Sequence, residues 1–298
     1  MIAKIVVLVG LVSAISFFAY KPLYAAVKGS FERDDMAEDQ VQDALKLLRE
    51  AQSTEVSSKQ LALLGQAAEN LGDDHPVCQS VLAPLLAATS ATAEQIASAT
   101  EQAIDALTFR PVKEAEMPAD FPPFTPVGCL EIKSYPAYRM ATATMPANEN
   151  SAFWSLFQHI SRNEIAMTTP VQMDHRGNEA NQPQRMGFLY SSPEIGPAGV
   201  DAQDERVEVV DVPALTVASI GMRGKRTEQR LAEAETRLRQ WLQTKPLQQQ
   251  YEPSGARRVL GYNSPMIPTS RQYFEVQLPL KIVATDNSAT GAEDSPGK

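Results

Sequence analysis

The sequence predicts an α+β protein with two folded parts behind an apolar N-terminal segment. Three observations lead to this fold class: a short apolar run at the start of the chain, helical periodicity over residues 34–108, and an internal echo in the second half. We expect a small all-α segment and then a strand–helix–strand–strand unit that occurs twice. A chain of 298 residues is long enough for two such domains.

The N-terminus carries an uncharged apolar run over residues 5–20, between Lys4 and Lys21. The run is shorter than the roughly 20 residues with which a helix crosses a bilayer, and it fits an uncleaved anchor or a signal peptide. Because Leu23 and Tyr24 spoil a clean cleavage site, we expect a transmembrane helix acting as a signal-anchor over residues 1–25. A removed signal peptide is the alternative. Export to a periplasmic or other extracytoplasmic space is expected in both cases.

Residues 34–108 show apolar side chains at helical spacing. The predicted helices cover residues 41–51, 59–72, 76–89 and 92–107. Thr92 followed by Gln95 predicts a capping box, and Gly72 is expected to end its helix. We expect His75 to be an exposed turn residue. This segment carries no chemical motif, so a spacer or an interaction module with an unknown protein partner is predicted.

Two further segments and the cysteines complete the domain organisation. Residues 109–126 contain five prolines and predict an extended linker, whereas residues 286–298 lose the apolar pattern and predict a disordered tail. Cys78 and Cys129 lie in different predicted domains. We expect two independent thiols, because a disulfide would require the domains to dock.

The second half repeats a short pattern at an offset of 77 residues, YPAYRMA over residues 135–141 and VPALTVA over residues 212–218. Each copy is followed by an amphipathic helix, then by an apolar segment that ends near a proline, and then by an aromatic strand. Such repeats bury their apolar faces against one another, so a two-fold sheet or barrel with two outer helices is expected.

The stretch EIAMTTPVQM, residues 164–173, is expected to be a strand in which Pro170 marks an edge, a bulge or an end. Alternation along a strand gives one apolar face, made of Ile165, Met167, Thr169, Val171 and Met173. That face is either ordinary core or the wall of a ligand cleft, since thioethers adapt well to flat partners.

The segment FWSLFQHISRNEIAMTTPV resembles the SOUL heme-binding protein family, in which an aromatic helix precedes an I-x-M-T-x-P-V strand. The matching residues are Phe153, Leu156, Ile160, Ile165, Met167, Thr168, Pro170 and Val171. The resemblance covers residues 127–280, within a predicted domain of residues 127–285. It implies a duplicated βαββ fold that forms a distorted barrel and binds heme or a related tetrapyrrole in a shallow apolar cleft.

The resemblance suggests where the ligand would lie but not which residue would hold iron. The expected cleft residues are His159, Met167, Val171, Met173, Tyr138 and Arg139. His159 is the candidate iron ligand, although it stands where the family has tyrosine, and a boundary or hydrogen-bonded histidine is the alternative. His175 is a second candidate, and Cys129 is also chemically suitable. Arg139 or Arg185 is expected near the propionates.

The sequence argues against two classes of protein, nucleic-acid-binding proteins and enzymes. Its net charge of −9 and the lack of a basic stripe argue against nucleic acid. No nucleophile elbow, zinc motif, P-loop or glycine-rich fingerprint occurs, so no enzyme is expected. The leading hypothesis is a membrane-tethered carrier or sequestering protein for a tetrapyrrole, with heme as a non-covalent cofactor. The alternatives are a scaffold or interaction protein that binds no heme, and a sensor of apolar small molecules.

Overall fold

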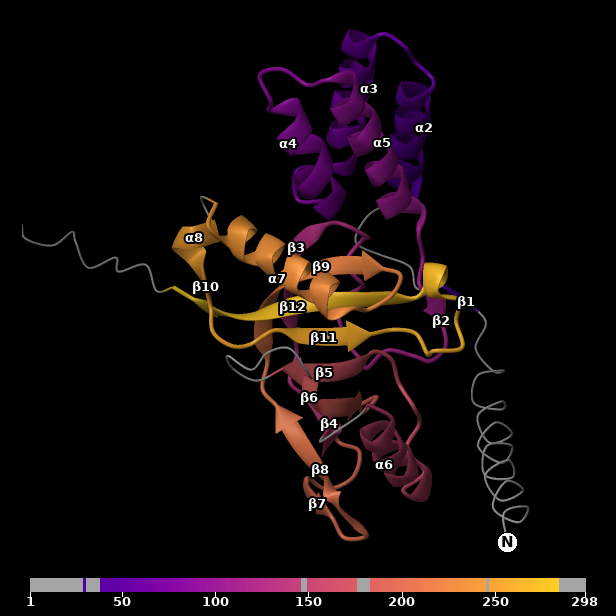
Figure 1. The fold of residues 1–298 in the computed structure, drawn as a ribbon, viewed down its shortest axis with the longest axis vertical. Helices are drawn as coiled ribbons and strands as arrows, with labels where there is room; N and C mark the ends of the chain where they lie inside the picture. The colour runs from indigo at the N-terminus through magenta and orange to yellow at the C-terminus, as the bar shows by residue number, and fades with distance from the viewer. Residues whose placement is uncertain (1–28, 31–37, 146–148, 176–182, 245–246, 284–298) are drawn as a thin grey trace, which may run out of the picture.

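The structure is a computed structural model that describes residues 29–30, 38–145, 149–175, 183–244 and 247–283. The predicted anchor over residues 1–25 and the predicted tail over residues 286–298 lie outside these ranges. Within them, no helix is both long and apolar enough to span a bilayer. A helical module stands on a large antiparallel sheet (Figure 1). A small two-stranded sheet joins β1 (Gly29–Ser30) to β2 (Val112–Lys113).

The helical module contains the helices that the periodicity predicts. They are α2 (Glu38–Gln52), α3 (Ser57–Leu71), a π-helical turn (Cys78–Leu82), α4 (Ala83–Leu86) and α5 (Ala93–Thr108). The capping box of Thr92 and Gln95 forms as predicted, and Gly72 ends α3 with a φ of 81°. The expectation for His75 was wrong. Its side chain is buried, and its Nδ1 accepts a hydrogen bond of 3.1 Å from the backbone N–H of Val77.

The helical module is docked on the sheet. Cys129, directly before the first strand of the sheet, is fully buried in the hydrophobic core of the helices, together with Cys78. No disulfide joins them. Ser80 accepts a 2.7 Å hydrogen bond from the backbone N–H of Leu130, and Arg223 forms a 2.9 Å ion pair with Asp105 on α5. Apolar burial and polar contacts therefore join the two parts.

The sheet has ten strands, and every pairing in it is antiparallel. The strands are β3 (Leu130–Tyr135), β4 (Tyr138–Thr144), β5 (Val171–His175), β6 (Pro183–Leu189), β7 (Gly199–Asp201), β8 (Asp204–Val212), β9 (Leu215–Arg223), β10 (Tyr251–Pro253), β11 (Arg258–Gly261) and β12 (Tyr273–Ile282). Their order is β3-β9-β12-β11-β5-β6-β4-β8-β7, with β10 beside β12.

This order is symmetric about the β11–β5 pair. Exchanging β3 with β8, β9 with β4, β12 with β6 and β11 with β5 reproduces the order, and β7 and β10 have no counterpart. In each half a helix follows the second strand: α6 (Glu149–Arg162) follows β4, and α7 (Glu228–Leu242) follows β9. A short helix, α8 (Leu247–Gln250), comes after α7, and a 3₁₀ turn (Thr269–Arg271) precedes β12. Among the described strands the sheet is open, with β3 and β7 at its two ends, so the pairing does not confirm the expected barrel.

Both long helices cover the same face of the sheet. Val171 of β5 packs in the cluster of α6, and Met173, two residues on, packs in the cluster of α7. Residues two apart on a strand point to the same side, so α6 and α7 share this face. Leu260 and Tyr138 belong to clusters on the opposite face. Figure 1 shows the two helices over different halves of the sheet.

The proline-rich segment, residues 109–126, covers the opposite face. It contains no helix, and Phe124 within it is part of the core. Phe121 and Phe124 pack against tyrosines of the sheet, with ring centroids between 5.0 and 5.5 Å apart. A Cβ at Gly221 would collide with the backbone of Thr125 and Pro126, so glycine lets the segment pass close to β9.

The predicted strand over residues 164–173 was wrong for its first seven residues. Glu164 has a φ of 55°, a left-handed conformation that ends α6, and β5 begins only at Val171, after Pro170. The intervening hydroxyl groups bond to distant carbonyls instead of extending the strand. Thr168 donates to Leu189 at 2.6 Å and Thr169 donates to Tyr262 at 3.0 Å.

Candidate functional site

The helix-covered face of β5 presents three side chains in sequence: Val171, Met173 and His175, which we name the β5 row. Val171 is partly exposed, whereas Met173 is 2% and His175 is 4% exposed. Met167 and the aromatic residue Phe157 of α6 pack partly exposed in the same cluster as Val171. The row therefore runs from a half-open apolar end to a buried polar end.

His175 is the unusual member of the β5 row. A shift in strand register between Asp174 and His175 interrupts the regular pairing, and such irregularities redirect the side chain. Both ring nitrogens are buried without a hydrogen-bond partner. Burial, with Arg257 and Arg226 nearby, lowers the pKa of His175 to about 4 despite opposing effects of Glu235 and the backbone of Met173. The imidazole is therefore neutral near pH 7.

Charged side chains from α7 and from the residues before β11 and α7 lie near this end of the row. Arg257 is buried, and its Nη2 lies 2.5 and 2.6 Å from the two carboxylate oxygens of Glu228. Its Nη1 lies 3.5 Å from Glu235. A Cβ at Gly261 would lie 3.3 Å from Met173 and 3.5 Å from Arg226, so glycine leaves room for this arginine beside the row.

His159 lies on α6, away from the β5 row, and both of its ring nitrogens form hydrogen bonds. Nδ1 bonds to the carboxylate of Asp201, and Nε2 lies 2.7 Å from the hydroxyl of Tyr190. Burial acts to raise the pKa of Asp201, but hydrogen bonds from His159, Gln203 and Arg162 lower it to about 2. Burial raises the pKa of Tyr190 to about 12. This histidine ties α6 to β7 and to the end of β6.

The other predicted site residues also separate from the β5 row. Tyr138 faces the opposite side of the sheet, where its hydroxyl bonds to Gln172 and to Arg258, each at 2.9 Å. Arg139 forms a two-pronged ion pair with Asp211 at 2.7 and 2.9 Å. Cys129 is inside the helical module. Arg185 bonds to Thr142 and lies 3.5 Å from Glu208. Of the predicted set, Met167 and Val171 share one hydrophobic cluster, and Met173 follows Val171 on the same strand but packs in another cluster.

The opposite face is sealed by a buried polar network. Glu275 is fully buried and lies 3.0 and 3.1 Å from Lys133 Nζ. It also accepts hydrogen bonds from the backbone of Thr125 at 2.8 Å and from the hydroxyls of Tyr262 and Ser219, both at 3.2 Å. Burial acts to raise the pKa of Glu275, but Lys133 and the hydrogen bonds from Thr125 and Gln277 together outweigh it, so that pKa is lowered. With the proline-rich segment above it, this network holds the fold together.

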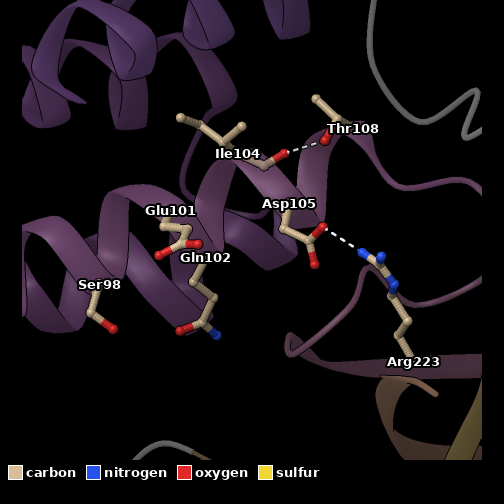
Figure 2. Close-up of a pocket in the computed structure, with 7 residues that line it drawn as sticks. All are labelled: Ser98, Glu101, Gln102, Ile104, Asp105, Thr108 and Arg223. Atoms are coloured by element: carbon tan, nitrogen blue, oxygen red, sulfur yellow. Dashed lines mark hydrogen bonds and ion pairs between the residues drawn. The ribbon is translucent and has the colours of Figure 1, made fainter. Parts of the chain in front are cut away.

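A surface cavity of about 570 Å³ lies at the junction of the two parts. Figure 2 shows Ser98, Glu101, Gln102 and Asp105 projecting from α5, with Arg223 reaching Asp105 from the sheet. Acids, an amide and an arginine dominate this lining, which does not suit a flat apolar ligand. We therefore place the candidate site on the β5 row. Among the described residues, no group of three acids, cysteines or histidines could hold a metal ion.

The candidate site thus combines the partly exposed Met167 and Val171 with a buried imidazole, on the face of the sheet that α6 and α7 cover. The chain belongs to the SOUL heme-binding protein family, whose model matches residues 120–279, more than half of its length. The resemblance found in the sequence is thus confirmed. The family is one of binding proteins, consistent with the absence of a catalytic motif in the sequence.

The chain is also similar to solved structures, at low identity. The C-terminal domain of EcmrR is 14% identical, with 52% of this chain and 98% of that chain covered and a TM-score of 0.39. A hydrolase from Listeria innocua is 12% identical, with 51% and 91% covered and a TM-score of 0.39. A putative transcription regulation protein from Staphylococcus aureus is 8% identical, with 51% and 97% covered and a TM-score of 0.30. No curated protein matches the chain.

Proposed function

We propose that this protein binds heme or a related tetrapyrrole along the β5 row and serves as a membrane-tethered carrier or sequestering protein. The observation that carries the proposal is the family match, which spans β5, α6 and α7. The half-open end of the row supplies the apolar contact. Met167 and Val171 are partly exposed there, beside the aromatic residues of α6.

The dimensions and charges of the β5 row support this ligand class. Four residue steps along a strand cover about 13 Å, so Val171 and His175 lie far enough apart to contact opposite parts of a flat ring system. Tetrapyrroles such as heme carry carboxylates, which pair well with guanidinium groups. Arg226 stands beside Met173 and provides such a group at the middle of the row. Apolar burial supplies affinity, and the arginine supplies orientation.

A titration of the full chain with hemin tests the proposal. We expect a saturable shift of the Soret band that is complete at one equivalent and is absent with an unrelated protein of similar net charge. Val171→Asp should weaken binding at least about tenfold, because it puts a charge in the apolar contact. Val200→Asp is the matched control, since Val200 is 63% exposed on β7. Equal affinity of the two variants would place the ligand elsewhere.

The tether and the export of the chain are supported by the apolar run over residues 5–20. Extraction of membranes at alkaline pH should leave the protein in the membrane fraction, and N-terminal sequencing should show an intact Met1. A mature terminus near Ala26 would replace the tether with a removed signal peptide. Saturable binding of other apolar compounds, but not of hemin, would favour the sensor hypothesis. Binding of a partner protein alone would favour the scaffold.

A further inference from the structure

The cavity at the junction of the two parts lies apart from the β5 row, and we name it the junction cavity. Its volume of about 570 Å³ is within the range of cavities that bind ligands. One face of α5 supplies most of the lining, because residues three and four apart on a helix, here 98, 101, 102, 105 and 108, lie on the same side. Arg223, from the end of β9, also lines it.

Most polar groups of this lining are available to a ligand. Within the described part of the chain, the side chains of Ser98, Glu101 and Gln102 form no hydrogen bond or ion pair, and Figure 2 shows them projecting from α5. Asp105 pairs through Oδ1 with Arg223 at 2.9 Å, which leaves its Oδ2 as an acceptor. The cavity therefore offers two carboxylates, an amide and a hydroxyl to a group that donates hydrogen bonds.

Arg223 is held in place and does not neutralise the whole lining. Its Nε donates a 2.7 Å hydrogen bond to the carbonyl of Ser270, its Nη1 bonds to Asp105, and its guanidinium lies 5.0 Å from the ring centroid of Phe109. These three contacts fix the planar guanidinium at one side of the cavity. Glu101, one turn before Asp105, therefore leaves the lining with an excess of negative charge.

The helical module around the cavity carries the same sign of charge. Residues 38–108 contain eleven acidic residues but three basic ones. Such a surface attracts a partner of opposite charge and repels an acidic one. Water screens a small cation in a surface cavity, whereas a protein that covers the cavity excludes water and strengthens the ion pairs inside it. The charge and the position of the cavity thus favour a protein partner.

We propose that α5 and the junction cavity form the docking site for a basic segment of a partner protein. A lysine or arginine side chain of that segment enters the cavity and pairs with Glu101 and with the second oxygen of Asp105. The inference goes beyond the proposed function, because it concerns the helical module and does not depend on what the β5 row binds. It gives the interaction module that the sequence predicts a partner of defined chemistry.

The test uses the full chain, in detergent, and a fluorescent octapeptide of alternating lysine and glycine as the probe. Fluorescence anisotropy measures its dissociation constant for the wild type, for Glu101→Gln and for the matched control Glu69→Gln. Glu69 is exposed on α3 of the same module and does not line the cavity, so each substitution removes one negative charge. Neither side chain forms a hydrogen bond or ion pair within the described part of the chain, so both variants should fold, which circular dichroism checks. An octapeptide of alternating glutamate and glycine, and spermine, are the comparison ligands.

We expect Glu101→Gln to weaken binding of the lysine peptide about fivefold, and Glu69→Gln to weaken it less than about twofold. Equal effects of the two substitutions would mean a diffuse attraction to the module and would overturn the proposal. Failure of the lysine peptide to bind more tightly than the glutamate peptide would also overturn it. If spermine binds in a way that depends on Glu101 and the lysine peptide does not, the ligand is a small polyamine and the protein partner is wrong. None of these results changes the outcome of the hemin titration.

Discussion

The buried pair of Lys133 and Glu275 gives the sharpest test of what holds the sheet together. Removing one member of a buried ion pair leaves an uncompensated charge, at a cost of about 3–5 kcal/mol. The two members are not equivalent here. Without Lys133, the carboxylate still accepts hydrogen bonds from Thr125, Ser219 and Tyr262. Without the charge of Glu275, the ammonium loses its counter-charge inside the core.

We therefore expect Glu275→Gln to lower the free energy of unfolding by about 3–5 kcal/mol. Lys133→Met should lower it by only about 2 kcal/mol, because the carboxylate keeps its other hydrogen bonds. The double variant should be more stable than Glu275→Gln alone, because the second change removes the orphaned ammonium. Urea unfolding at pH 7, followed by circular dichroism, measures all three. A double variant less stable than Glu275→Gln would refute this account of the network.

Three further predictions concern separate parts of the fold. The pKa of His175, about 4 in the folded state against about 6.5 unfolded, means that the unfolded chain takes up a proton first as pH falls. The contribution of this group to stability is therefore complete above pH 6.5 and falls at lower pH. Between pH 7 and pH 5 the free energy of unfolding of the wild type, measured in urea, should fall by about 2 kcal/mol. The variant His175→Leu should not show this fall. Thr92→Ala removes the capping box of α5 and should cost about 1 kcal/mol in thermal unfolding, whereas Thr92→Ser should cost little. Phe124→Ala should cost about 3–5 kcal/mol in urea unfolding if the proline-rich segment is core, and less than 1 kcal/mol if it is a loose linker.

Local sequence signals predicted local structure well. The capping box of Thr92 depends on residues three apart, and Gly72 ends α3 because it adopts a left-handed conformation without strain. The repeat at an offset of 77 residues anticipated the symmetric order of the strands. These features need no knowledge of distant contacts, so the sequence alone contains them.

Features that depend on distant contacts could not be predicted. The partners of His159 lie 31 and 42 residues further along the chain, and no spacing rule links them. Thr168 and Thr169 leave the strand pattern because their hydroxyls find carbonyls on β6 and beyond β11. The proline-rich composition of residues 109–126 concealed the burial of Phe124. His175 was a second candidate from the sequence, but the burial of its ring beside Met173 could not be predicted.

The docking of the helical module has a mechanical consequence. Because Cys129 is built into the core of the helices and Ser80 holds the first residue of β3, the two parts cannot swivel independently. They should melt in one calorimetric transition rather than two. A protein that binds α2–α5 would thereby also hold the sheet, with α6 and α7, in a fixed orientation.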